Sequence, residues 1–78
     1  MDDVLAELLT LTRAVNDLGR VEYRNHHGQL HRVHGPALIT HHTQSWYFNG
    51  RLHREGGGPA VVLPGCQKWY THGKFIHD

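Results

Sequence analysis

Histidine is the residue type with the widest chemical use in this sequence, because nine of the 78 residues are histidines. Neutral imidazole is a good ligand for Zn²⁺, and a structural zinc site needs four ligands in a tetrahedral arrangement. The candidate ligands are His26, His27, His31 and His34. On an extended strand His31 and His34 would face opposite sides, and no C-x-x-C or H-E-x-x-H motif accompanies them. We expect no cofactor, with zinc as the alternative. The other interpretation is that His31 and His53 pack their rings between hairpins.

Nucleophilic catalysis has little support in the sequence. Cys66 is the only thiol and Ser45 the only serine, and Cys66 follows the turn-forming pair Pro64-Gly65. A histidine nearby in space would activate this thiol, but the position also suits the first residue of a strand. The glycine run at residues 56–58 precedes Pro59 and not a helix, so it does not match a phosphate-binding loop. The sequence predicts a protein that is not an enzyme.

The length and net charge of the chain limit the classes of function that it can have. A chain of this length holds one domain with a small core, and its single cysteine cannot form an internal disulfide. Eight basic and seven acidic residues give a formal net charge of +1, which attracts nucleic acid or a membrane surface only weakly. The acidic start and the short apolar stretches match neither a secretory signal nor a bilayer span. We expect a soluble cytoplasmic protein with a protein partner.

Residues 2–18 have the pattern of an amphipathic helix. Apolar residues recur at alternating spacings of four and three, at Val4, Leu8, Leu11, Val15 and Leu18. Asp2 or Asp3 is suited to cap the start, and Gly19 to end the helix in a left-handed conformation. The stripe must pack on something, because an isolated helix of this length is marginal in water. It covers the protein's own sheet, forms a homodimer seam, or docks on another partner.

The rest of the sequence repeats itself. Gly35-Pro36-Ala37-Leu38-Ile39 corresponds to Gly58-Pro59-Ala60-Val61-Val62 at an offset of 23, and the same offset aligns Trp46-Tyr47 with Trp69-Tyr70. A looser copy aligns Gly28-Gln29-Leu30-His31-Arg32 with Gly50-Arg51-Leu52-His53-Arg54. The sequence thus divides into an N-terminal helical segment, residues 1–19, and three repeats at about 20–34, 35–57 and 58–78.

Each repeat has the features of a β-hairpin. Asn49-Gly50 is typical of a type I′ turn, in which both central residues have positive φ, and His27-Gly28 and His72-Gly73 hold the matching positions. Apolar runs on either side of Pro64-Gly65 are typical of paired strands. The sequence therefore predicts an α+β, mainly β fold, in which one N-terminal amphipathic helix precedes an antiparallel meander of β-hairpin repeats.

The run Trp46-Tyr47-Phe48-Asn49-Gly50-Arg51-Leu52-His53-Arg54, followed by Gly58-Pro59-Ala60, resembles MORN-type repeats. It is similar to the divergent form found in small proteins of bacteriophages and large viruses, Trp-Tyr-x-Asn-Gly-Lys-Leu-His-Arg-x-x-Gly-Pro-Ala. The resemblance covers residues 20–78, although the first copy lacks the tryptophan and the usual acidic residue before Gly-Pro-Ala is missing. It implies MORN-like hairpins stacked into a sheet, and a role as a scaffold or interaction module.

A stacked sheet leaves one face for a partner. Tyrosine and arginine are enriched among the residues that contribute most to binding energy at protein interfaces, so the candidate contacts are Tyr47, Arg51, Arg54, Tyr70 and Lys74. By its resemblance to phage proteins, the chain is expected to inhibit or modulate a host enzyme or an antiviral defence complex, for example as an anti-CRISPR-type inhibitor. The alternative is an accessory protein that stacks nucleic-acid bases on its tryptophans or binds metal through its histidines.

Overall fold

The computed structural model describes residues 3–78, and the side chains of residues 6–78. Within that range the chain forms one short helix, α1 (Asp3–Thr10), and nine strands. The strands are β1 (Thr12–Val15), β2 (Val21–Arg24), β3 (Leu38–Ile39), β4 (Gln44–Ser45), β5 (Tyr47–Phe48), β6 (Arg51–Leu52), β7 (Val61–Leu63), β8 (Cys66–Thr71) and β9 (Lys74–His77). The protein is therefore mainly β with one helix, as the sequence predicts.

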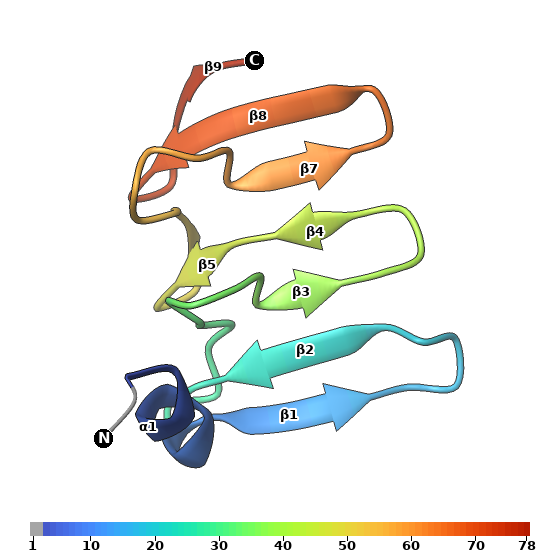
Figure 1. Ribbon diagram of the computed structural model, residues 1–78, viewed down its shortest axis with the longest axis vertical. Helices are drawn as coiled ribbons and strands as arrows, with labels where there is room; N and C mark the ends of the chain where they lie inside the picture. The colour runs from blue at the N-terminus through green and yellow to red at the C-terminus, as the bar shows by residue number, and fades with distance from the viewer. Residues whose placement is uncertain (1–2) are drawn as a thin grey trace.

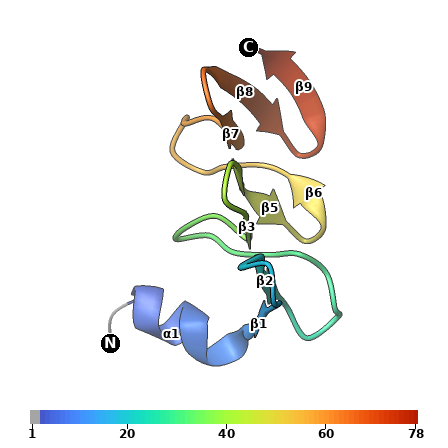
Figure 2. The same ribbon diagram turned by 90° about the vertical axis from the view of Figure 1, so that its right-hand side faces the viewer.

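Seven strands form one antiparallel sheet in the order β1-β2-β3-β4-β7-β8-β9, and β5 pairs with β6 in a second, small sheet. Figure 1 shows the hairpins β1–β2, β3–β4 and β7–β8 one above another, so the sheet grows along the long axis of the molecule. Seen edge-on in Figure 2, β5 and β6 lie on one side of this sheet, toward which its last strand β9 also bends, and α1 lies on the other. Stretches that follow one another in sequence thus become neighbours in space.

The predicted helix over residues 2–18 is wrong beyond Thr10, where α1 ends. Residues 12–15 instead form β1, which pairs antiparallel with β2. A helix of this length is marginal in water, whereas the pairing gives β1 both backbone hydrogen bonds and a neighbouring strand. Two apolar residues of the predicted stripe beyond α1 are correspondingly exposed, Val15 at 53% and Leu18 at 77%. The proposed cap Asp2 and the side chain of Val4 lie outside the described residues.

A side-chain amide stabilises the turn that replaces the second half of this helix. The Oδ1 atom of Asn16 accepts hydrogen bonds from the backbone N–H groups of Leu18 and Arg20, both at 2.9 Å. Gly19 has the left-handed conformation expected of it, with φ of 79°, but it closes the β1–β2 hairpin and not a helix. Asparagine is favoured in turns for this kind of local hydrogen bond.

The short helix α1 is anchored to its own chain by one carboxylate. The two oxygens of Glu7 accept hydrogen bonds from the backbone N–H groups of Val33, at 2.7 Å, and His34, at 2.9 Å. These residues precede Gly35-Pro36 in the connection to β3. Hydrogen bonds to an ionised acceptor are stronger than those between neutral groups. The described part of α1 is thus tied to the chain's own connection through Glu7, while Leu8 and Leu9 are exposed at 40% and 72%. The homodimer seam and the docking on another partner stay predictions.

The core is built around two alanines. Ala37 and Ala60 are fully buried, and the aromatic rings of Tyr23 and Trp46 are each 8% exposed. The backbone N–H of Tyr23 donates to the carbonyl of Ala37 at 2.8 Å, and that of Trp46 donates to the carbonyl of Ala60 at 2.7 Å. Both alanines stand where one hairpin meets the next, so their small side chains allow neighbouring strands this close approach.

We expect Ala60→Val to lower the free energy of unfolding by about 1–3 kcal/mol, because the added methyl groups enter a fully packed junction. The matched control is Ala14→Val on the exposed strand β1, where a β-branched residue is well tolerated and a change below about 0.5 kcal/mol is expected. Urea denaturation of both variants measures the difference. Equal stability of the two variants would contradict this account of the core.

Candidate binding surface

Two arginines lie across the aromatic rings of the core. The guanidinium carbon of Arg32 is 4.1 Å from the centre of the Tyr23 ring, and that of Arg54 is 3.9 Å from the Trp46 ring. In addition, the NH1 group of Arg54 donates to the carbonyl of Pro59 at 3.1 Å. The predicted partner contact Arg54 is therefore engaged within the chain, where it joins the end of one hairpin to the start of the next.

Glycine is required behind each guanidinium. A Cβ atom added at Gly35 would lie 2.8 Å from the guanidinium carbon of Arg32, and one at Gly58 would lie 2.8 Å from that of Arg54. Real Cβ atoms do not approach so closely, so a side chain here would displace the arginine. Glycine at the first position of each Gly-Pro-Ala run thus leaves room for the stacked guanidinium.

We expect Gly58→Ala to lower the free energy of unfolding by about 1–2 kcal/mol, the scale of a cation–π contact at a partly buried ring. If displacement of the guanidinium is the cause, the same substitution costs clearly less in an Arg54→Ala background, and a double-mutant cycle in urea measures this coupling. Additive effects of the two substitutions would show that Arg54 is not what constrains Gly58.

Two histidines link successive hairpins through their ring nitrogens. The Nδ1 atom of His31 accepts a hydrogen bond from the backbone N–H of Asn49 at 3.0 Å, and Nδ1 of His53 accepts one from the N–H of His72 at 3.1 Å. An amide N–H only donates, so both rings are neutral imidazoles that carry their proton on Nε2. The ring of Phe48 lies 4.7 Å from that of His31 and 5.9 Å from that of His53, centre to centre. These two histidines therefore pack between hairpins, as one of the two interpretations of the sequence holds.

We expect His53→Phe to lower the free energy of unfolding by about 1–3 kcal/mol, because the amide of His72 loses its acceptor at a part-buried position. His42→Phe, at an exposed position, is the control and is expected to change stability by less than about 0.5 kcal/mol. Both are compared by urea denaturation at pH 8. A loss in the control as large as that in His53→Phe would show that the effect does not depend on the His72 amide.

The predicted partner-binding residues in the hairpins β5–β6 and β8–β9 lie on two opposite faces. Tyr47 is paired with Leu52, and Phe48 with Arg51. Opposed residues share a face and adjacent ones alternate, so Tyr47 and Arg51 point in opposite directions. The same reasoning separates Tyr70, paired with Phe75, from Lys74, paired with Thr71. Arg51 and Lys74 are exposed, whereas Tyr47 and Tyr70 are half-buried.

Exposed side chains at corresponding positions of successive hairpins form a column beside the hairpin turns. The Cβ of Gln29 lies 3.6 Å from a Cβ built on Gly50, and the Cβ of Arg51 lies 3.6 Å from one built on Gly73. Each of these side chains thus begins over the turn of the following hairpin. We call the exposed residues Gln29, Arg51 and Lys74 the turn column. The sequence-based candidates Arg51 and Lys74 belong to it, and Gln29 was not among the predicted site residues.

Three of the four candidate zinc ligands, His26, His27 and His31, line one hollow, and His34 lies apart from them. The rings of His26 and His27 are 4.0 Å apart, centre to centre, at the turn after β2, whereas His34 lies in the connection that α1 contacts. Among the described residues, no group of three or more histidine, cysteine, aspartate or glutamate side chains is placed to hold a metal ion.

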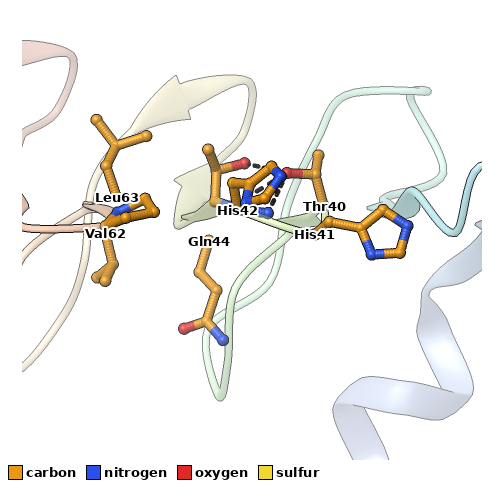
Figure 3. A pocket seen from close by; sticks show the side chains of 8 residues that line it. Thr40, His41, His42, Gln44, Val62 and Leu63 are labelled. Carbon is orange, nitrogen blue, oxygen red and sulfur yellow. Dashed lines mark hydrogen bonds between the residues drawn. The ribbon is translucent and has the colours of Figure 1, made fainter.

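The other predicted chemical groups lie in strands or at a turn. Cys66 begins β8, opposite Leu63, and Ser45 is buried in β4. A pocket of about 300 Å³ beside the β3–β4 turn is lined in part by His41 and His42. Figure 3 shows the ring of His41 directed away from the other lining side chains. The hydroxyl groups of Thr40 and Thr43 in this pocket hydrogen-bond to each other at 2.6 Å.

Comparison of the sequence and structure with protein-family models, curated proteins and solved structures gives no match. Within residues 3–78, no helix has the length and apolar character needed to cross a membrane.

Proposed function

We propose that this chain is a small, non-enzymatic protein-binding module built from MORN-like β-hairpin repeats. The recurrence of individual contacts supports the repeat. The Arg32–Tyr23 stacking corresponds to Arg54–Trp46, and the His31–Asn49 hydrogen bond corresponds to His53–His72. Each pair of contacts is separated by the same 22–23 residues that separate the matching sequence motifs.

The observation that carries the binding function is the division of each hairpin into internal and exposed positions. The arginine, histidine and alanine at corresponding places hold neighbouring hairpins together, and they are the same residue types in both copies. The turn column differs at every step, with Gln29, Arg51 and Lys74. Side chains that do not hold the stack together can vary without loss of the fold, which suits a recognition surface.

The resemblance to small phage proteins suggests the class of partner. We propose that the chain is encoded by a bacteriophage and binds a host enzyme or an antiviral defence complex in the host cytoplasm, as an inhibitor or modulator. Base stacking is a weaker candidate, because Trp46 is 8% exposed and its ring is covered by Arg54. Metal binding is also weaker, because no three potential ligands among the described residues are placed to hold a metal ion.

Capture from a bacterial lysate tests this function. Tagged protein is expected to retain one stoichiometric protein, and the double variant Arg51→Glu, Lys74→Glu is expected to weaken capture at least about tenfold, as loss of interface hot spots does. The control variant Arg20→Glu, Lys68→Glu makes the same change of net charge away from the turn column and should capture normally. Recovery of nucleic acid alone, or equal capture by both double variants, would reject the proposal.

A further inference from the structure

The direction of every hydrogen bond around Asn25 is fixed by the backbone. The Oδ1 atom of Asn25 accepts from the backbone N–H groups of His27, at 3.0 Å, and Gln29, at 3.1 Å. Backbone N–H groups only donate, so the other end of the Asn25 side chain must be its NH₂ group. That group donates to Oε1 of Gln29 and to Oδ1 of Asn49, both at 3.1 Å. The side-chain oxygens of Gln29 and Asn49 therefore accept hydrogen bonds from Asn25.

The same reasoning leaves three free donor groups beside Asn25. Gln29 and Asn49 keep their NH₂ groups, which make no hydrogen bond to any residue that the structure describes. His31 uses Nδ1 to accept from the backbone N–H of Asn49, so its free group is Nε2–H. This Nε2 atom has no partner among the described residues and is not among the buried unpartnered atoms, so solvent reaches it.

These donors line one groove. The side chains of Gln29, His31 and Asn49 border a hollow of about 690 Å³, together with His26, His27 and the start of the chain's first connection at Thr10 and Leu11. The groove lies at the first member of the turn column, so it is continuous with the proposed partner surface. The three free donors along it favour a ligand group that accepts hydrogen bonds.

In the next hairpin, the corresponding histidine, His53, has a carboxylate as the partner of its Nε2 atom. The Nε2 atom of His53 lies 2.9 Å from Oε1 of Glu55, which stands two residues further along the chain. Two residues after His31 stands Val33, which has no polar side chain. The first hairpin thus offers the same Nε2–H without the carboxylate that the second hairpin supplies for itself.

We propose that this groove binds a carboxylate side chain from an acidic segment of the partner protein, with His31 Nε2–H, Gln29 and Asn49 as donors. This inference rests on the proposed protein-binding function and states which chemistry the partner presents there. Hydrogen bonds to an ionised acceptor give the contact its strength.

Titration with an N-acetylated, C-amidated hexaglutamate peptide tests the proposal by NMR. We expect the largest shifts at the side-chain NH₂ signals of Gln29 and Asn49 and at the His31 ring, with none from hexaglutamine. The double variant Gln29→Glu, Asn49→Asp keeps the oxygens that Asn25 needs and replaces each free NH₂ by an oxygen. It should weaken hexaglutamate binding by about tenfold or more, because donors become like charges.

The control adds the same two negative charges elsewhere, at Gln44→Glu and Gln67→Glu, and should bind hexaglutamate as the native chain does. Unchanged binding in the groove variant overturns the proposal, as does a stronger response of the groove to oligo-thymidylate, which would indicate phosphate recognition. If the groove variant still captures the lysate partner at native strength, the protein-binding function stands and this carboxylate site is wrong. If no lysate protein is captured at all, the protein-binding function fails first.

Discussion

The stacking of an arginine on the aromatic ring of its own hairpin is the contact on which the rest of the sheet depends. The guanidinium carbons lie 4.1 and 3.9 Å from the ring centres, and the same side chains reach the carbonyls of Pro36 and Pro59 in the next segment. One side chain therefore joins two successive hairpins. Each residue of the Gly-Pro-Ala run contributes to this junction. Glycine leaves room for the guanidinium, the proline carbonyl accepts its hydrogen bond, and alanine permits the close approach of strands.

This construction suits a chain too short for a large core. No large side chain among those described is completely buried, and the fully buried residues are alanines. Stability must then come from many small directional contacts, each a sizeable share of the few kcal/mol by which a domain of this size is folded. The cation–π stacks and the histidine–amide hydrogen bonds are contacts of this kind, and they recur where hairpins meet. Arg54, one of the predicted partner contacts, takes part in one of these contacts within the chain.

The sequence predicted the elements whose causes are local. The positive φ angles at Asn49-Gly50 and His72-Gly73 follow from residue type and were predicted, as were the strands beside Pro64-Gly65. The prediction of a helix over residues 2–18 was wrong because apolar spacing shows only which side chains would share a helix face. It does not reveal that β1 pairs with β2. The stacking of Arg54 on Trp46 was missed for a similar reason, because the sequence does not show which ring an arginine covers. Its role in partner binding stays a prediction. The role of Asn25 depends on the distance to Asn49, which sequence alone does not give.

The hydrogen-bond polarity around the turns follows from the same framework. A backbone amide of the next hairpin faces each of His31 and His53, so each ring must turn an acceptor inward and a proton outward. The amide groups of Gln29 and Asn49 obey the same rule through Asn25, whose orientation two backbone N–H groups fix. The outward surface of the first turn is thus rich in donors because its inward surface must accept. A substitution in the turn column changes which groups face solvent. The backbone N–H groups still set the direction of these hydrogen bonds. The contacts that hold the hairpins together thereby also decide what kind of ligand the exposed side can recognise.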